Sequence, residues 1–126
     1  MGYARRKERP VEQSAEIAEL DQIARLYGAV GQCRRKATTD SRTAKLFAAG
    51  LPKMAQKLVE EAAEVAIEAV RGQRAKVRDE SADLLYHLVV LWTALNISPD
   101  EVWGEMKRRE EMMGIAEKVP KRLQGV

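Results

Sequence analysis

The sequence is poor in the residues that stabilise secreted and membrane proteins. It contains one cysteine, Cys33, which excludes an intrachain disulfide and favours a reducing compartment, so we expect a cytoplasmic protein. The charged N-terminus leads into an amphipathic segment, whereas a signal peptide needs an apolar one. The longest apolar run, residues 84–95, contains His87 and is too short to span a bilayer. We therefore expect no membrane association.

Aromatic residues and proline are also scarce, and this indicates the fold class. The 126 residues include one phenylalanine and four prolines, while alanine, leucine, glutamate, lysine and arginine dominate. This composition favours an all-α protein, and the length predicts a single domain over residues 1–126. The net charge of +3 is mild, and no aromatic residues interleave with the basic runs, so we do not expect nucleic acid as a partner. An anionic ligand such as a polyphosphate suits this charge.

Apolar residues recur at helical spacing along most of the chain. The spacing and the turn residues predict helices at residues 11–30, 42–49, about 52–72, 74–96 and 99–113. We expect them to form a helical bundle of four main helices plus a short one. A basic arm at residues 1–10 and a loose tail at residues 119–126 flank this bundle.

Several residues predict where these helices begin and end. Gly28 and Gly31 predict the end of the first helix, with a polar loop over residues 32–42. Ser98 and Glu101 have the spacing of a capping box, which begins the last helix. Three apolar residues of that helix are expected to face inward: Val102, Trp103 and Met106.

The long central helix carries its charged residues on one side. At 100° per residue they fall within an arc of about 100°, and they are Lys53, Lys57, Glu60, Glu61, Glu64 and Glu68. The other positions are apolar, so we expect a mostly buried helix with one charged stripe. Most such stripes are solvated faces with ion pairs. Here, however, Glu64 has a like charge four residues away on either side, and each such pair destabilises a helix by about 0.2–0.5 kcal/mol. This stripe therefore suggests a bound cation.

The next helix carries a second acidic group. Glu80, Asp83 and His87 share one face and lead into the apolar run. Pairing with nearby arginines and lysines is the alternative role for the two acids. They lie beyond the first turn, so the helix macrodipole does not explain them. A tight turn at Gly72 makes the two helices antiparallel and brings both acidic groups to similar heights, where they can face each other.

Carboxylates that converge without a thiolate suit Mg²⁺, or Mn²⁺, and argue against zinc. Mg²⁺ shares phosphate oxygens readily, so the implied chemistry is metal-assisted attack of water on a polyphosphate. Lys53 and Lys57 are then candidates to neutralise phosphate charge. A lone imidazole such as His87 is more often a hydrogen-bonded core residue than a catalyst.

These motifs resemble a known group of enzymes. The pattern E-E-x-x-E at Glu60, Glu61 and Glu64, followed by E-x-x-D at Glu80 and Asp83, resembles the metal-binding signature of the all-α MazG-like nucleotide pyrophosphohydrolases. Within that superfamily, three stretches are similar to the phosphoribosyl-ATP pyrophosphohydrolases of histidine biosynthesis: residues 41–47, 80–88 and 108–118.

The resemblance implies a Mg²⁺-dependent enzyme that cleaves phosphoribosyl-ATP to phosphoribosyl-AMP and pyrophosphate, as a homodimer or higher oligomer. It implies four metal ligands, Glu61, Glu64, Glu80 and Asp83. Glu60 would be a further ligand or would orient the attacking water. The residues implied on the substrate side, together with the phosphate candidates above, are Ser41, Thr43, Lys45, Lys53, Lys57 and His87.

Two alternatives remain open at this point. Arg42 and Val59 depart from the residues that are usual in the family, and the N-terminal segment is longer than usual. These departures leave room for a related pyrophosphohydrolase that acts on free or non-canonical nucleoside triphosphates. The other alternative is a non-catalytic helical module that binds nucleic acid or a partner helix through its basic ends. Such a module would show no metal dependence and a steep loss of binding with salt.

Overall fold

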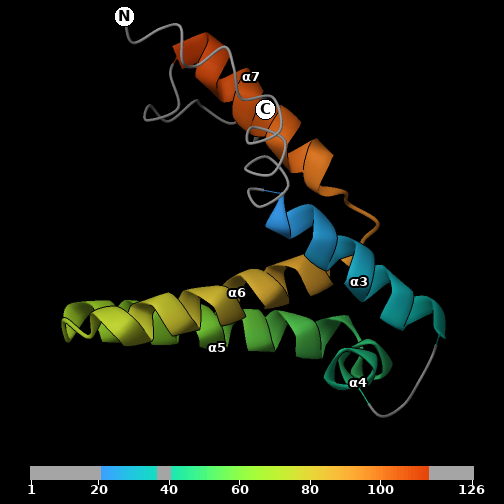
Figure 1. Cartoon of the computed structure of the whole chain (residues 1–126), viewed down its shortest axis with the longest axis horizontal. Helices are drawn as coiled ribbons and strands as arrows, with labels where there is room; N and C mark the ends of the chain where they lie inside the picture. Colours follow the sequence, from blue (N-terminus) through green and yellow to red (C-terminus); the bar gives the residue numbers. More distant parts are fainter. Residues whose placement is uncertain (1–20, 37–40, 114–126) are drawn as a thin grey trace, which may run out of the picture.

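The computed structural model describes residues 21–36 and 41–113, and this part of the chain is all-α, as predicted (Figure 1). Its helices are α3 (Gln22–Lys36), α4 (Arg42–Ala49), α5 (Leu51–Val70), α6 (Arg74–Ala94) and α7 (Pro99–Met113). The predicted arm, the predicted tail and the first ten residues of the first predicted helix lie outside the described residues. In the part of the chain that the structure describes, no helix combines the length and the apolar character needed to cross a membrane.

Helices α5 and α6 form a long antiparallel hairpin, which positions the acidic residues (Figure 1). The turn between them has the hydrogen bonds of a Schellman motif: Gln73 N donates to Glu68 O at 2.9 Å and Gly72 N donates to Ala69 O at 3.0 Å. Gly72 has a φ of 73°, a conformation in which a side chain would be strained. The predicted stop at Gly72 is therefore confirmed, and the turn fixes how the two helices align.

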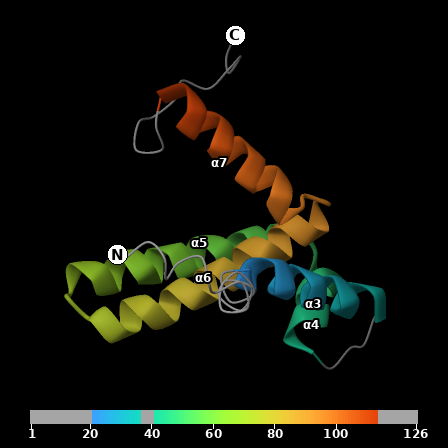
Figure 2. The ribbon, with the colours of Figure 1, turned by 45° about the horizontal axis from the view of Figure 1, so that its top comes forward.

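Helices α3 and α4 cover one end of this hairpin (Figure 2). The buried apolar core lies where the four helices meet, and its members are Val30, Leu46, Met54, Val89 and Val90. Ser41 begins α4 as its N-cap, because its Oγ accepts a hydrogen bond from Ala44 N at 2.9 Å. The core therefore holds the short helix against the hairpin next to the acidic residues.

Helix α3 corrects one prediction, because it continues through Gly28 and Gly31 to Lys36. Tertiary contacts explain the extension. Val30 is buried in the core, and Arg34 Nη1 donates a 2.7 Å hydrogen bond to the carbonyl oxygen of Thr93 near the end of α6. These contacts outweigh the weak helix propensity of two glycines. The predicted polar loop is thus helical up to residue 36.

Helix α5 corrects a second prediction, because in the single chain it is not mostly buried. Its described buried residues are Met54 and Glu61. By contrast, Val59 is 67% exposed, Ile67 53% and Val70 90%. The hairpin packs only one side of α5 against α6, so the opposite apolar side has no cover within the described chain. An exposed apolar stripe of this kind is typical of an interaction surface.

Helix α7 leaves the hairpin at an angle and extends away from it (Figures 1 and 2). Its predicted capping box is confirmed, since Glu101 N donates to Ser98 Oγ at 3.3 Å and Ser98 N donates to Glu101 Oε2 at 3.0 Å. Trp103 contacts Trp92 of α6 edge to face, with ring centroids 6.2 Å apart. Trp103 therefore faces α6 as predicted but stays 41% exposed, and Met106 is 42% exposed, because α7 packs little of its length against the other helices.

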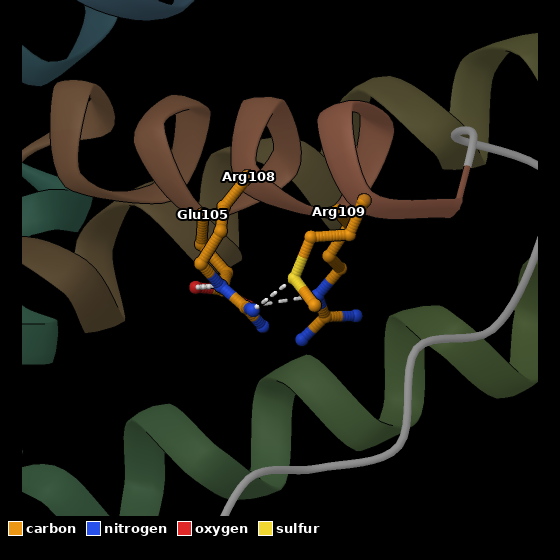
Figure 3. Close-up of polar contacts among 4 residues, drawn as sticks. Glu105, Arg108 and Arg109 are labelled. Atoms are coloured by element: carbon orange, nitrogen blue, oxygen red, sulfur yellow. Dashed lines mark hydrogen bonds and ion pairs between the residues drawn. The ribbon is translucent and has the colours of Figure 1, made fainter.

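The two arginines of α7, Arg108 and Arg109, are paired within the helix (Figure 3). Arg108 donates two hydrogen bonds to the Glu105 carboxylate, at 2.8 and 3.0 Å, and Arg109 Nε donates a third at 2.9 Å. The two guanidinium groups lower the pKa of Glu105 to about 2. This carboxylate is therefore ionised at any physiological pH, and it offsets part of the positive charge of Arg108 and Arg109.

Candidate functional site

Three carboxylates from the two hairpin helices converge. Glu61 and Glu64 of α5 and Glu80 of α6 each offer one oxygen, and these three oxygens lie within 4.8 Å of one another. Glu61 is buried, Glu80 is half-buried and Glu64 is exposed, so the cluster opens to solvent on one side. The expectation that the two acidic groups face each other across the hairpin is confirmed for these three residues.

Glu61 is the innermost of the three, and its environment suits a cation. Its Oε2 is buried and has no hydrogen-bond partner among the described residues. Burial raises the pKa of Glu61 to about 7, and the neighbouring Glu80, Glu64 and Asp83 add to the rise. A divalent cation would supply a partner for Glu61 Oε2 and would offset the repulsion among the neighbouring carboxylates. The all-oxygen donor set suits a hard cation, so these residues could hold a metal ion.

The raised pKa predicts how stability depends on pH in the metal-free protein. Folded Glu61 keeps a proton up to about pH 7, whereas in the unfolded chain it loses that proton near pH 4.5. The folded state binds more protons between these values, so stability falls as the pH rises through this window. We expect this side chain to account for a loss of up to about 3 kcal/mol in the free energy of unfolding.

Urea denaturation in EDTA at pH 5, 6 and 7 measures this loss, with Glu61→Gln as the neutral control. The free energy of unfolding of the wild type should fall relative to that of Glu61→Gln as the pH rises. Adding a divalent cation should oppose the trend, because the cation binds the ionised carboxylate. The same pH dependence in both proteins would contradict the prediction.

The two other predicted acidic residues lie next to this cluster. Asp83 is close enough to raise the pKa of Glu61, although it does not belong to the three-carboxylate set. Glu60 instead accepts hydrogen bonds from Gln56 at 2.9 Å and from Lys57 at 3.4 Å. These two contacts lower the pKa of Glu60. The roles of Asp83 as a ligand and of Glu60 as a ligand or water-orienting group stay predictions.

A basic pocket of about 530 Å³ lies next to the acidic cluster. It is lined by Arg42, Lys45, Leu46, Ala49, Lys53, Lys57 and His87. Lys57 and Lys53 stand about one and two turns before Glu61 on α5, so the pocket continues along the helix from the carboxylates. Positive charge beside a candidate cation site can accept a polyphosphate whose reacting end reaches the cation.

His87 separates the basic pocket from the acidic cluster. It is 1% exposed, and its Nε2 lies 3.9 Å from Glu61 Oε1 and accepts a hydrogen bond from Arg42 Nη2 at 3.1 Å. Burial lowers the pKa of His87, and the charges of Arg42 and Lys57 lower it further. The imidazole is therefore neutral at neutral pH. The interpretation of His87 as a hydrogen-bonded core residue is confirmed, and its ring also forms one wall of the pocket.

Comparison with known proteins assigns this arrangement to a family. Residues 23–110, which include the whole acidic cluster and the basic pocket, match the family described as phosphoribosyl-ATP pyrophosphohydrolase. The chain belongs to this family. It is 55% identical over 101 residues to phosphoribosyl-ATP pyrophosphatase 2 of Rhodopseudomonas palustris, which covers 80% of this chain and 77% of the relative. It is 51% identical over 108 residues to the phosphoribosyl-ATP pyrophosphatase of Azospirillum brasilense, and this match covers 85% of this chain and 94% of the relative.

In this member of the phosphoribosyl-ATP pyrophosphohydrolase family, two of the predicted substrate residues make contacts within the protein. Ser41 caps α4, and buried Thr43 shares a 2.6 Å hydrogen bond through its Oγ1 with the hydroxyl of Tyr86. Neither residue lines the basic pocket. Contact of Ser41 or Thr43 with substrate therefore stays a prediction, whereas Lys45, Lys53 and Lys57 line the pocket as their predicted role requires.

Sequence reasoning missed one charged residue of the pocket of this pyrophosphohydrolase. Arg42 lies within residues 41–47, one of the stretches similar to the family, but it was not chosen as a site residue. It lines the pocket beside Lys45. Its guanidinium lies over the ring of Tyr86, 4.8 Å from the centroid. The three-residue spacing of Arg42 and Lys45, which puts both on one face of α4, could have identified it.

Proposed function

We propose that this protein hydrolyses phosphoribosyl-ATP to phosphoribosyl-AMP and pyrophosphate, the second step of histidine biosynthesis. The observation that supports this function best is the carboxylate cluster of Glu61, Glu64 and Glu80 beside a basic pocket, in a chain of the phosphoribosyl-ATP pyrophosphohydrolase family. Family membership also speaks against the non-catalytic module considered from the sequence. A cytoplasmic location, expected from the single cysteine, stays a prediction.

The acidic cluster would hold Mg²⁺, with Mn²⁺ as a substitute. Glu61, Glu64 and Glu80 would be ligands, and Asp83 would join them through a modest side-chain movement or a water molecule. When bound, Mg²⁺ neutralises phosphate charge and lowers the pKa of water. The unpartnered, buried Oε2 of Glu61 supports this assignment, because a cation supplies the contact that it lacks.

The basic pocket would bind the triphosphate of the substrate. Lys45, Lys53 and Lys57 offer three ammonium groups that can be shared among the phosphate oxygens. Glu60 stands next to Lys57, and its lowered pKa keeps it ionised at neutral pH. An ionised carboxylate accepts a hydrogen bond from a water molecule, so Glu60 is a candidate to orient the attacking water toward the phosphate chain.

We also infer that the protein works as a homodimer or a higher homo-oligomer. The exposed stripe of Val59, Ile67 and Val70 falls on one side of α5, within an arc of about 80°. It lies on the opposite side from much of the contact with α6, so a second copy can cover it without disturbing the hairpin. Isologous pairing of this kind is the commonest way in which identical chains bury an apolar helix face.

The test is pyrophosphate release from phosphoribosyl-ATP by the purified protein, with and without Mg²⁺. We expect release that requires Mg²⁺, stops on addition of EDTA and is restored by excess Mg²⁺ or Mn²⁺. A parallel assay with a panel of free nucleoside triphosphates separates the two candidate substrates. Activity on free triphosphates alone would overturn the assignment of phosphoribosyl-ATP while keeping the metal site. Release that is undiminished in EDTA would contradict the metal site itself.

A further inference from the structure

Arg42 is held in place by two neighbouring residues of α6. Its guanidinium lies 4.8 Å from the centroid of the Tyr86 ring, and its Nη2 donates a 3.1 Å hydrogen bond to His87 Nε2. Tyr86 is itself fixed by the 2.6 Å hydrogen bond between its hydroxyl and Thr43 Oγ1. Cation–π contact and a single hydrogen bond orient the arginine without neutralising it. The side chain therefore stays charged and is already oriented before any ligand binds.

No described residue other than His87 accepts from the guanidinium of Arg42, so within this part of the chain its remaining donors can meet an anion. A guanidinium has five N–H donors, and in the described chain the one such partner of Arg42 is His87 Nε2. No carboxylate among residues 21–36 and 41–113 lies within ion-pair distance of it. Arg42 is exposed and lines the 530 Å³ pocket. The lysine next to the carboxylates differs in this respect, since Lys57 pairs with Glu60 at 3.4 Å.

The position of Arg42 relates it to the acidic cluster as well as to the pocket. His87 Nε2 lies between the two, 3.1 Å from Arg42 Nη2 and 3.9 Å from Glu61 Oε1. A phosphate bound against the carboxylate cluster through a cation would thus come within reach of the guanidinium. The flat fork of an arginine can hold two oxygens of one phosphate, which an ammonium group cannot do in the same way.

We propose that Arg42 is a substrate-binding residue that grips the pyrophosphate portion of the substrate beside the metal site, with Tyr86 and His87 as its positioning residues. This inference deepens the proposed function and rests on it for the identity of the substrate. The ligand chemistry, a polyphosphate with its divalent cation, rests on the basic pocket and the acidic cluster. Arg42 adds to the three lysines a directional contact for the group that leaves as pyrophosphate.

Binding of inorganic pyrophosphate in the presence of Mg²⁺, measured by titration calorimetry, tests this without assuming the substrate. We expect Arg42→Gln to weaken binding about 10- to 100-fold, the usual effect of losing a charged hydrogen-bonding partner. Glutamine keeps a polar side chain at this position and removes the charge. The pyrophosphate affinity of Arg42→Lys should lie between those of the wild type and Arg42→Gln, because lysine keeps the charge and lacks the two-pronged geometry of the guanidinium. The matched control is Arg25→Gln, an exposed arginine on α3.

Steady-state kinetics on phosphoribosyl-ATP completes the test. We expect kcat/KM of Arg42→Gln to fall by a similar factor, with a melting temperature equal to that of the control variant. Wild-type affinity for pyrophosphate in Arg42→Gln would overturn the inference, and so would equal losses in Arg42→Gln and Arg25→Gln. Pyrophosphate binding that depends on Arg42, in a protein that does not hydrolyse phosphoribosyl-ATP, would support the role of Arg42 and overturn the proposed function.

Discussion

Glu64→Gln is expected to reduce kcat/KM on phosphoribosyl-ATP by well over about a hundredfold, because even residues that only support metal ligands typically contribute 10- to 100-fold. The side chain is exposed and supplies one of the three converging oxygens. Its amide replacement keeps the shape and removes the charge that would bind the cation. The fold should survive, since the change also relieves like-charge repulsion along α5. Pyrophosphate release at several Mg²⁺ concentrations measures the effect.

Asp83→Asn tests the candidate ligand that lies just outside the three-carboxylate set. We expect a loss of similar size if Asp83 joins the metal site, with circular dichroism and melting temperature close to wild type. The control is Glu111→Gln, which removes an exposed carboxylate from α7, far along the chain from the hairpin. Persistent activity in both Glu64→Gln and Asp83→Asn would remove the assignment of the metal site.

Ile67→Glu is expected to convert the proposed homo-oligomer to a monomer. A carboxylate in the centre of the exposed stripe would lose its hydration in the interface without gaining a partner, and the symmetry of a dimer would place it there twice. We expect the dissociation constant to rise by more than about a hundredfold, the result of burying unpaired charge at a cost of several kcal/mol. Light scattering coupled to size-exclusion chromatography at micromolar concentration measures the mass.

Gln32→Glu is the matched control for this experiment, because it places the same new charge on an exposed position of α3 away from the stripe. Its mass should equal that of the wild type. If the wild type itself has the mass of a single chain at these concentrations, the stripe on α5 is not a self-association surface.

The predicted helix boundaries succeeded where the determinants are local. The caps at Ser41, Ser98 and Glu101 and the turn at Gly72 depend on hydrogen bonds between residues three to five positions apart, which a sequence pattern encodes directly. The end of α3 failed because Arg34 is held by the carbonyl of Thr93, from a residue 59 positions away. A contact at that separation is not visible in local spacing.

Burial was harder to predict than helicity. The apolar side of α5 predicted a mostly buried helix, yet Val59, Ile67 and Val70 are exposed in the single chain. Sequence pattern identifies surface that is apolar but not the molecule that covers it. The convergence of Glu61, Glu64 and Glu80 was predictable because one tight turn fixes the alignment of the two helices. The contacts of Arg42 with Tyr86 and His87 were not predictable, since they depend on the packing of α4 against α6.

Helix α4 has only eight residues, bounded by the Ser41 cap and by Gly50, and it is anchored to α6 through Thr43. The converging carboxylates all belong to the other two helices, α5 and α6. The share of phosphate binding that α4 contributes and the carboxylate cluster of the hairpin can therefore change separately during evolution. A library for directed evolution would vary the exposed positions of this short segment, Arg42, Lys45, Ala48 and Ala49. Clones with altered binding of the phosphate chain should keep the carboxylate cluster of the hairpin.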